Sequence, residues 1–238
     1  MIDTYKKALK QIEKDSEEVA KKPQNYKSPR IVKMDSLYEP AALFFPGDFT
    51  NKNEGVFKVN IRSYKQLMRS DVRNLTLHEA VPGHSLQLQY TTLDTKIPRW
   101  LRMISFTSTV EGWALYAERF IKNPSVLETY STLNSMQIRA VRLVVDIGIH
   151  IHGWSFNQAS NFMHKYLYNS DEEIASEVYR YSVLPGQACS YMIGCLVINK
   201  MFKESKLPTK KFNTLFLENS FLPLCFVGLN IKTSQNND

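Results

Sequence analysis

Apolar residues change their spacing along the chain, and this change predicts a short β region followed by a long helical one. Alternating charges and strong helix formers over the first 22 residues predict a helix, which two prolines in "KPQNYKSPR" bring to an end. Further on, Phe57, Val59 and Ile61 alternate with polar residues, which is typical of a half-buried strand. The stretch before it, "EPAALFFPGDFTNKNEG", is punctuated by proline and glycine and predicts a loop. We therefore expect one strand, near residues 55–61.

The spacing after this strand predicts helices almost to the end of the chain. One is expected from about residue 63 through "LTLHEAVPGHSLQ", another at about 108–121 and a long one at about 125–154. Ser125, Ser155 and Ser170 are each followed three residues later by Glu or Gln, which is the capping-box signature of a helix start. Breaks are expected at Pro185-Gly186 and at Pro223. The sequence thus predicts a mostly α fold with a small β element.

Composition and charge exclude several classes of protein. The 238 residues are 43% hydrophobic and 22% charged, which is ordinary for a globular chain. The net charge is +7, but the basic residues alternate with acidic ones and form no nucleic-acid motif. The three cysteines lack C-x-x-C spacing and are expected to be buried free thiols in a reducing compartment.

No apolar run approaches the roughly 18 residues that a transmembrane helix needs. The N-terminus also lacks the apolar core of a signal peptide. We therefore expect a soluble, cytoplasmic chain without a transmembrane segment. A fragment of a longer protein would have lost any such signal.

The segment "LTLHEAVPGHSLQLQY" places His78, Glu79 and His84 inside an apolar run. In an H-E-x-x-H helix the histidines are four apart and share a face, whereas His78 and His84 are six apart, roughly 240° around an ideal helix. Pro82-Gly83 lies between them, and a break there can return His84 toward His78. The alternative is two polar residues near a helix end that the Pro-Gly pair terminates.

The neighbouring residues suggest roles in a metal-dependent hydrolase. Glu79 directly follows His78, where the general base for a zinc-activated water would stand. A catalytic zinc held by two histidines needs a third protein ligand and an open fourth position. Glu111, in "STVEGWALYAERF", is the favoured ligand, because an unpaired carboxylate in so apolar a run would be costly. Glu118 on the same face is the competing ligand, and a surface or salt-bridged Glu111 is the alternative.

A polar stripe marks the long predicted helix. Arg142, Asp146 and His150 recur every four residues in "IRAVRLVVDIGIHIHGW" and so share one face of an otherwise apolar helix. The stripe either faces a site or consists of an intrahelical Arg142–Asp146 pair with a core histidine.

A further group surrounds the break at Pro185-Gly186, where "EVYRYSVLPGQACSYMIG" holds Arg180, Tyr181 and Tyr191. A Tyr or His near a metal could stabilise the oxyanion of a tetrahedral intermediate, and an Arg could hold a substrate carboxylate. The spacing does not choose among these roles, so His150, Tyr181 and Tyr191 are candidate catalytic groups, with Arg142 and Arg180 as candidate substrate-binding groups.

Four blocks together resemble the DUF885 family, a group of predicted zinc metallopeptidases related to the gluzincin, thimet-oligopeptidase-like fold. They are "LTLHEAVPGHSLQ", "VEGWALYAERF", "RAVRLVVDIGIHIHGWS" and "EVYRYSVLPGQACSYMIG", and the likeness runs from about residue 38 to 224. The resemblance implies a zincin-like helical metallopeptidase domain. It also implies zinc ligation by His78, His84 and Glu111, with Glu79 as base and His150 and the tyrosines lining the site.

Members of this family are commonly more than twice as long. Residues 1–238 are therefore expected to be the C-terminal catalytic portion of a larger fold, with residues 1–37 as a helical lead-in and loop. Ser85 stands where the family often carries another histidine, and position 85 is seven residues after His78.

These observations predict Zn²⁺-dependent hydrolysis of peptide bonds, with the strand at residues 56–61 pairing its edge with the substrate. One alternative is a truncated, non-catalytic remnant that binds metal or a partner chain, such as the missing N-terminal half. Another is hydrolysis of a non-peptide amide or ester. No nucleic-acid partner is expected.

Overall fold

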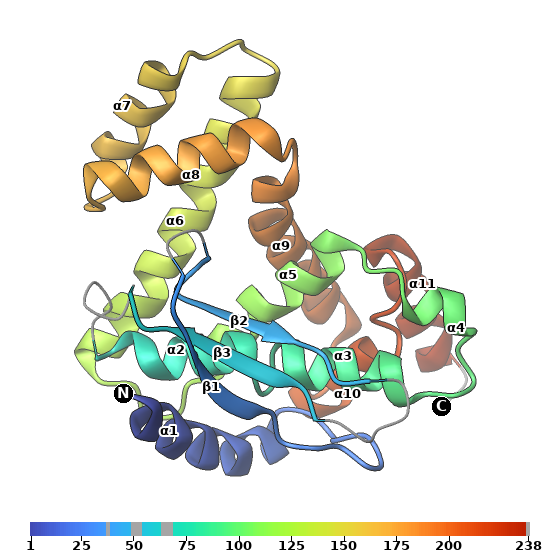
Figure 1. Ribbon diagram of the computed structural model, residues 1–238. Helices are drawn as coiled ribbons and strands as arrows, with labels where there is room; N and C mark the ends of the chain where they lie inside the picture. Colours follow the sequence, from blue (N-terminus) through green and yellow to red (C-terminus); the bar gives the residue numbers. More distant parts are fainter. Residues whose placement is uncertain (37–38, 49–53, 63–68, 237–238) are drawn as a thin grey trace.

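The computed structural model describes residues 1–36, 39–48, 54–62 and 69–236 (Figure 1). Its N-terminal part contains α1 (Ile2–Asp15), the short 3₁₀ helix η1 (Ser16–Glu18), β1 (Arg30–Met34), β2 (Ala42–Phe45) and β3 (Val56–Asn60). The remainder is helical: α2 (Asp71–Glu79), α3 (His84–Leu93), α4 (Arg99–Arg102), α5 (Thr107–Ala117), η3 (Glu118–Phe120), α6 (Val126–His150), α7 (Phe156–Tyr166), α8 (Asp171–Val183), α9 (Gln187–Ser205), α10 (Thr209–Glu218) and α11 (Leu224–Asn236). The expected mostly α fold with a small β element is confirmed.

The sheet is larger than the sequence predicted. Among the described residues it has three strands in the order β1-β3-β2, with β1 parallel and β2 antiparallel to β3. The prediction of a single strand was wrong, because β2 is a short apolar run next to a proline and lacks the alternation that identifies a half-buried strand. β3 lies in the centre and is paired on both sides, so it has no free edge to offer a substrate. Outer strands β1 and β2 alone could do so.

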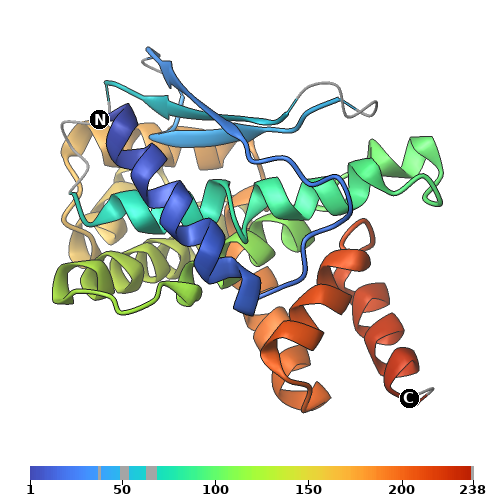
Figure 2. The ribbon, with the colours of Figure 1, turned by 90° about the horizontal axis from the view of Figure 1, so that it is seen from below.

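The sheet lies over the α2–α3 segment, and α1 packs beside it (Figure 2). Phe57 and Val59 on β3 are fully buried, and the ring of Tyr5 on α1 meets the Phe57 ring edge-on at 5.6 Å between centroids. This apolar contact joins the sheet to α1 and forms one wall of the core that holds α2.

Helices α5 and α9 cross very closely on the other side of α2. A Cβ atom added to Gly112 on α5 would lie 2.5 Å from the Cα of Gly194 on α9, so only glycine allows this approach. The crossing fixes where Glu111, the neighbour of Gly112, projects.

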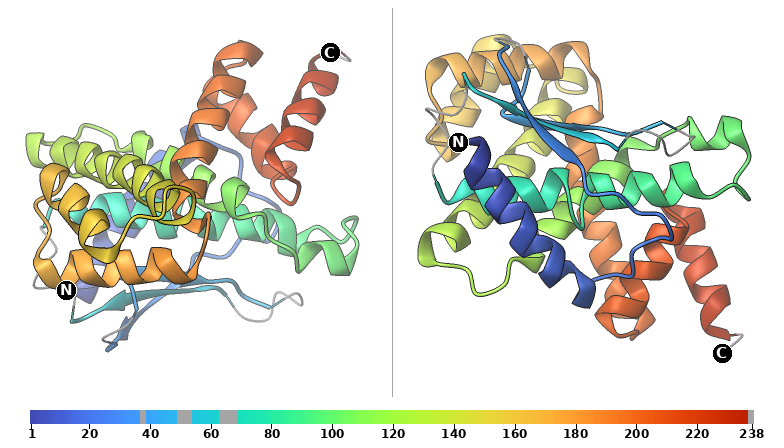
Figure 3. Two further views of the ribbon diagram at one scale, coloured as in Figure 1. Left: turned by 90° about the horizontal axis from the view of Figure 1, so that it is seen from above. Right: turned by 60° about the horizontal axis from the view of Figure 1, so that its bottom comes forward.

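The second half of α6 joins α7 and α8 in a separate helical layer (Figure 1). This layer has its own small core, formed by Val141, Val145, Met163, Ile174 and Val178 among other residues. Helices α10 and α11 pack against the C-terminal part of α9 (Figure 3).

All three expected capping boxes are present, at Ser125, Ser155 and Ser170. The two expected breaks are confirmed as well. α9 follows Gly186, which has a left-handed backbone with φ 77°, and α11 begins at Leu224, directly after Pro223. Helix α2 begins at Asp71, and residues 63–68, where a helix start was expected, lie outside the described part of the chain.

Candidate metal centre

A tight break between α2 and α3 brings the two histidines together. α2 ends at Glu79 and α3 begins at His84, and the amide of Gly83 donates to the carbonyl of Leu77 at 3.0 Å. A Cβ atom at Gly83 would lie 1.9 Å from the carbonyl oxygen of His78, so the break requires glycine. The centroids of the His78 and His84 rings are 4.9 Å apart.

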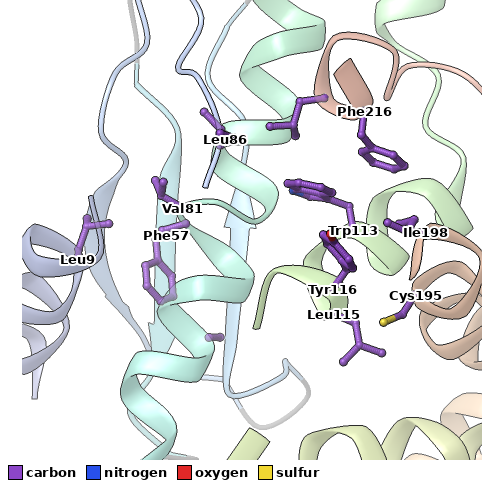
Figure 4. Close-up of a cluster of buried hydrophobic side chains, with 14 of the residues drawn as sticks. Leu9, Phe57, Val81, Leu86, Trp113, Leu115, Tyr116, Cys195, Ile198 and Phe216 are labelled. Atoms are coloured by element: carbon purple, nitrogen blue, oxygen red, sulfur yellow. The ribbon is translucent and has the colours of Figure 1, made fainter. Parts of the chain in front are cut away.

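Trp113 of α5 stabilises the backbone of the break. Its indole Nε1 donates to the carbonyl oxygen of Pro82 at 2.7 Å. Figure 4 shows the Trp113 ring between the α2–α3 segment and the side chains of Phe216 and Ile198. Trp113 is fully buried and stacks on Phe216 with 5.0 Å between ring centroids. The apolar core therefore positions the chain at the point where His84 starts a new helix.

His78, His84 and Glu111 form a compact group of possible metal ligands whose ligand atoms all lie within 4.8 Å of one another. Glu111 Oε2 is 3.7 Å from His78 Nε2 and 3.4 Å from His84 Nε2. Tetrahedral zinc with bonds of about 2.0–2.1 Å places neighbouring ligand atoms about 3.3 Å apart, so two of these separations are close to the required size.

The carboxylate of Glu111 is short of partners. Its Oε2 atom is buried and has no hydrogen bond to any residue that the structure describes, and the same holds for His84 Nδ1. Burial by itself would raise the pKa of Glu111, but the two histidines hold the pKa of this carboxyl well below its usual range. A buried, ionised oxygen between two imidazoles is the environment that a bound cation would satisfy. Two imidazoles and one carboxylate fit a zinc ion that keeps a fourth position open.

Glu118 lies behind His78 and does not compete with Glu111 as a ligand. Its Oε1 is 2.7 Å from His78 Nδ1, on the side of the ring away from the cluster, and it is 2% exposed. Its Oε2 accepts hydrogen bonds from Asn74 Nδ2 at 2.8 Å and from Ser135 Oγ at 2.6 Å. A carboxylate in this position fixes the orientation of the imidazole, so that Nε2 faces the other two possible ligands.

The protonation states follow from burial and from these neighbours. Burial alone would lower the pKa of His78, but its contacts with Glu111 and Glu118 raise the pKa to about 9. Glu79, the last residue of α2, is also buried. Its burial raises the pKa of the carboxyl, and the charges of His84 and His78 oppose that shift only in part. Glu79 therefore lies within the electrostatic reach of both histidines, and its carboxyl is easier to protonate than one in water.

Tyr191 connects the cluster to a second polar group. Its ring stacks on that of His78 with 6.5 Å between the centroids. The Cζ atom of Arg142 lies 5.4 Å from the centre of the same Tyr191 ring. Arg142 Nη2 is 2.9 Å from Glu177 Oε2, and Arg180 Nη2 is 2.8 Å from the same oxygen. The structure thus gathers Arg142, Arg180 and Tyr191 beside the cluster, and the two arginines share one acidic partner, Glu177, that the sequence did not single out.

Tyr181 belongs to this second group and not to the cluster of ligands. Its hydroxyl donates to Glu177 Oε2 at 2.5 Å, and the guanidinium carbons of Arg142 and Arg180 lie 5.9 and 5.0 Å from its ring centre. The hydrogen bond directs the hydroxyl toward Glu177.

The three residues of the polar stripe on α6 contact three different partners. Arg142 contacts Glu177, so the intrahelical pair with Asp146 is not what holds it. Asp146 is buried and accepts from the amide of Gly186 at 3.1 Å, which caps the start of α9. His150 is exposed, and its Nε2 is 2.9 Å from the carbonyl oxygen of Tyr181.

His150 is far from the part of α6 that faces the cluster. Arg139 is the α6 residue whose Nη2 lies 3.7 Å from Glu118. At about 1.5 Å per residue, His150 stands roughly 16 Å farther along the helix. The structure therefore does not bring His150 to the three possible ligands, because a stripe that shares one helix face still spreads along the axis.

Ser85 points away from the cluster. It lies on α3, beyond the break, so the seven-residue return to the face of His78 does not apply. Its Oγ accepts a hydrogen bond from Gln89 Nε2 at 3.2 Å, within its own helix. The histidine-to-serine difference therefore falls outside the group of three.

Several contributing residues had weak signals in the sequence. Asn74 precedes His78 by four residues on the same helix and so shares its face. Glu177 precedes Arg180 by three residues, which is the spacing of an ion pair on a helix. Ser135 and Arg139 carried no signal, because their role depends on how α6 packs against η3.

Comparison with known proteins identifies relatives but no activity. A family model described as "Bacterial protein of unknown function (DUF885)" matches residues 1–228. Two solved structures share the fold, each described as a "putative lipoprotein". One, from Colwellia psychrerythraea, has a TM-score of 0.89 at 23% identity, and one of unknown function from Shewanella oneidensis has 0.78 at 19%. No curated protein matches the chain.

The chain is about half as long as these neighbours or less. The two alignments cover 98% and 96% of this chain but 42% and 45% of the neighbouring chains. At such low identity the likeness shows the fold alone.

Within the described residues, no single helix has the length and apolar character to cross a membrane, and α8 with α9 passes that test only as a pair bent by 89°. Because both neighbours are described as lipoproteins, the expected cytoplasmic location is not confirmed.

Proposed function

Because this chain belongs to the DUF885 family, whose description assigns no function, we propose its activity from the geometry of the site: zinc-dependent hydrolysis of peptide bonds. The chain is then a C-terminal catalytic portion of a zincin-like metallopeptidase. One observation carries the proposal. His78, His84 and Glu111 meet in a largely buried group, one carboxylate oxygen of which has no hydrogen bond within the described part of the chain, and Glu118 orients His78 from behind.

When bound at such a site, zinc supplies a Lewis acid that polarises a carbonyl group and lowers the pKa of water. Residues of the chain would carry out the proton transfer and would orient the metal ligands. Glu79 accepts the proton of the attacking water, because it is buried beside both histidines and its pKa is raised toward the range of a general base. Glu118, with Asn74 and Ser135, keeps His78 in the tautomer that leaves Nε2 free.

Tyr191 is the group best placed to stabilise the oxyanion of the tetrahedral intermediate. Its hydroxyl accepts a hydrogen bond from Gln187 Nε2 at 3.2 Å, so its own proton remains available. Burial, reinforced by the carboxylate of Glu111, raises the pKa of Tyr191, which keeps the hydroxyl protonated. Of the three proposed groups, His150 and Tyr181 have their described contacts elsewhere.

A peptide is favoured over another amide or ester by the sheet. In the described part of the chain β2 pairs with β3 on one side only, and it packs against both α2 and α3. An extended peptide can add to such an edge through main-chain hydrogen bonds. A small amide or ester has no backbone to pair in this way.

The test compares two residues that the proposal treats differently. Zinc content and hydrolysis of a peptide library are measured for the unaltered chain, Glu79→Gln and His84→Ala, with Glu172→Gln on the exposed start of α8 as matched control. Glu79→Gln should keep its zinc and lose roughly 10²- to 10⁴-fold in turnover, whereas His84→Ala should lose the metal. Full activity with Gln at position 79, or no zinc in the unaltered chain, would rule the proposal out.

A second candidate is a non-catalytic half that binds a partner chain, and one face of α6 favours it. Val126, Tyr130, Leu133, Val144, Ile147 and Ile151 are all exposed, and Leu133 and Ile151 are 60% and 74% exposed. Gln137 and Ala140 complete a spacing of alternating three and four residues along this face. Such spacing is typical of a seam for another helix. In this reading the partner supplies the half that the two longer neighbours possess.

A further inference from the structure

Two arginines from different helices surround one glutamate beside the candidate metal centre. Glu177 on α8 receives Arg142 Nη2 from α6 at 2.9 Å and Arg180 Nη2 from its own helix at 2.8 Å. Arg180 Nε and the Tyr181 hydroxyl also donate to the same carboxylate, at 3.2 and 2.5 Å. With two guanidinium groups and one carboxylate, this arginine cluster carries an excess of one positive charge.

The spare hydrogen-bonding capacity lies on Arg142. Arg180 uses a further nitrogen, Nη1, to donate to Gln187 Oε1 at 2.8 Å. Among the described residues Arg142 has one ion pair, with Glu177, and a contact with the side chain of Tyr181, while its buried Nε has no hydrogen-bond partner there. That nitrogen is closed to solvent, so a ligand would meet the exposed part of the Arg142 side chain, and a carboxylate is a group that pairs well with a guanidinium. Solvent still reaches both arginines, because their side chains are 15% and 30% exposed.

The distance to the candidate metal centre suits a short piece of peptide. The ring of Tyr191 is 6.5 Å from the ring of His78 and 5.4 Å from Arg142 Cζ, so these two separations limit the distance from Arg142 to the His78 ring to about 12 Å. An extended chain spans roughly 3.3–3.6 Å per residue. Between the scissile bond and Arg142 there is therefore room for only one to three residues.

We propose that Arg142 binds the free C-terminal carboxylate of the substrate, so that the site removes one to three residues from the C-terminus of a peptide. The inference rests on the proposed peptidase function and specifies its substrate end. Gln187 and Tyr191 lie between the arginine cluster and the ligands, along the path that the last residues would take. Arg180 holds Glu177, and Glu177 holds Arg142 in place.

The competing explanation is that the Arg142–Glu177 pair only ties α6 to α8. The two explanations differ in one property that does not depend on stability. If Arg142 is an anchor, binding discriminates a peptide acid from the same peptide with an amidated C-terminus. If the Arg142–Glu177 pair only stabilises the packing of α6 on α8, the two peptides bind with equal affinity, whatever fraction of the protein is folded.

The experiment uses the zinc-loaded Glu79→Gln chain, in which binding is read without turnover. A pentapeptide with an N-terminal fluorescent label is titrated as the free acid and as the C-terminal amide, and binding is followed by fluorescence anisotropy. We expect the acid to bind about 10- to 100-fold more tightly, which is the usual range for a charge-assisted hydrogen bond. Adding Arg142→Gln should bring this ratio close to one. Adding Arg30→Gln, at an exposed pair with Glu54, should leave it unchanged.

Several outcomes would overturn the inference. They are equal binding of acid and amide, no binding of either peptide, or a preference for the acid that survives Arg142→Gln. A third peptide, amidated but ending in aspartate, separates the main-chain carboxylate from an acidic side chain, and equal binding of this peptide also contradicts the proposal. Mapping the products of the unaltered chain distinguishes a failure of the proposed peptidase function from a failure of the proposed role of Arg142. Internal cleavage of acid and amide alike removes the inference and keeps the peptidase, whereas acid preference without hydrolysis keeps the anchor and removes the peptidase.

Discussion

At the scale of single residues, His78 is the side chain on which the site depends, because both of its ring nitrogens are used. Nε2 faces Glu111 and His84, while Nδ1 contacts Glu118 at 2.7 Å. In the metal-free chain the same carboxylates raise the pKa of His78 to about 9, after overcoming the opposite effect of burial. A zinc ion bound as proposed would therefore have to displace a proton from this ring at neutral pH.

We predict that zinc affinity rises with pH, by about tenfold per unit, from pH 7 to about 9, and levels off above that value. The direction follows because the protonated imidazole cannot bind metal, and His78 loses its proton only as the pH passes its raised pKa. The measurement is a competition titration against a zinc-binding dye whose own pH dependence is known.

Glu118→Gln is the informative variant for this curve. Removing the carboxylate lowers the pKa of His78, so the affinity should level off at a lower pH, and its plateau should be about 10- to 100-fold weaker because the ring loses its orienting partner. A pH-independent affinity in the unaltered chain between pH 7 and 9 would show that His78 is not the proton-releasing ligand.

At the scale of elements, the break between α2 and α3 turns two residues on different faces of an ideal helix into neighbours. It depends on the absence of a side chain at Gly83, where a Cβ would lie 1.9 Å from the carbonyl oxygen of His78 and 2.4 Å from that of Leu77. These contacts are with backbone atoms, so no side chain can move aside to relieve them. Trp113 holds the same segment from α5.

Gly83→Ala should therefore destabilise the chain by roughly 1–3 kcal/mol, the usual range for overpacking, and should weaken zinc binding by separating His84 from His78. Urea denaturation and zinc titration measure the two effects. Gly228→Ala, on α11, is the matched control, because the nearest atoms to its added methyl group belong to the flexible side chain of Met201 on α9, at 3.2 Å. Unchanged stability and zinc affinity for Gly83→Ala would contradict the importance of the tight break.

At the scale of the whole molecule, three faces of α6 lie in three different environments. One face carries Ser135, Arg139 and Arg142 toward the candidate metal centre and the arginine cluster. A second packs Val141 and Val145 into the small core with α7 and α8. The third is the exposed apolar face from Val126 to Ile151. A soluble surface rarely leaves so long an apolar row uncovered.

We expect this third face to associate with another helix, and in the isolated chain with a second copy. Each large apolar side chain buried in such a contact contributes about 1.5–3 kcal/mol, so Leu133→Glu combined with Ile147→Glu should abolish concentration-dependent association. Sedimentation measurements over a range of concentrations would detect the change. Tyr168→Glu is the control, since Tyr168 is 96% exposed and lies off α6. Association that persists in the double variant would place the contact elsewhere.

The sequence by itself determined the features that depend only on residues close together in the chain. The three capping boxes, the break at Pro185-Gly186 and the predominance of helix depend on residues within a few positions of one another, so the local pattern was sufficient. The identity of β3 also followed from local alternation. β1 and β2 did not, because a short apolar run acquires its strand character from the partner with which it pairs.

Only the tertiary structure decided which polar groups meet. Glu111 and Glu118 both lie near His78, but the turn from α5 into η3 gives one carboxylate to Nε2 and the other to Nδ1. Arg142 and Glu177 are brought together by the packing of α6 against α8, and no spacing in the sequence encodes that contact. His150 shares a helix face with Arg142 and still lies roughly 12 Å from it along the axis, because periodicity gives direction around a helix and not position along a site.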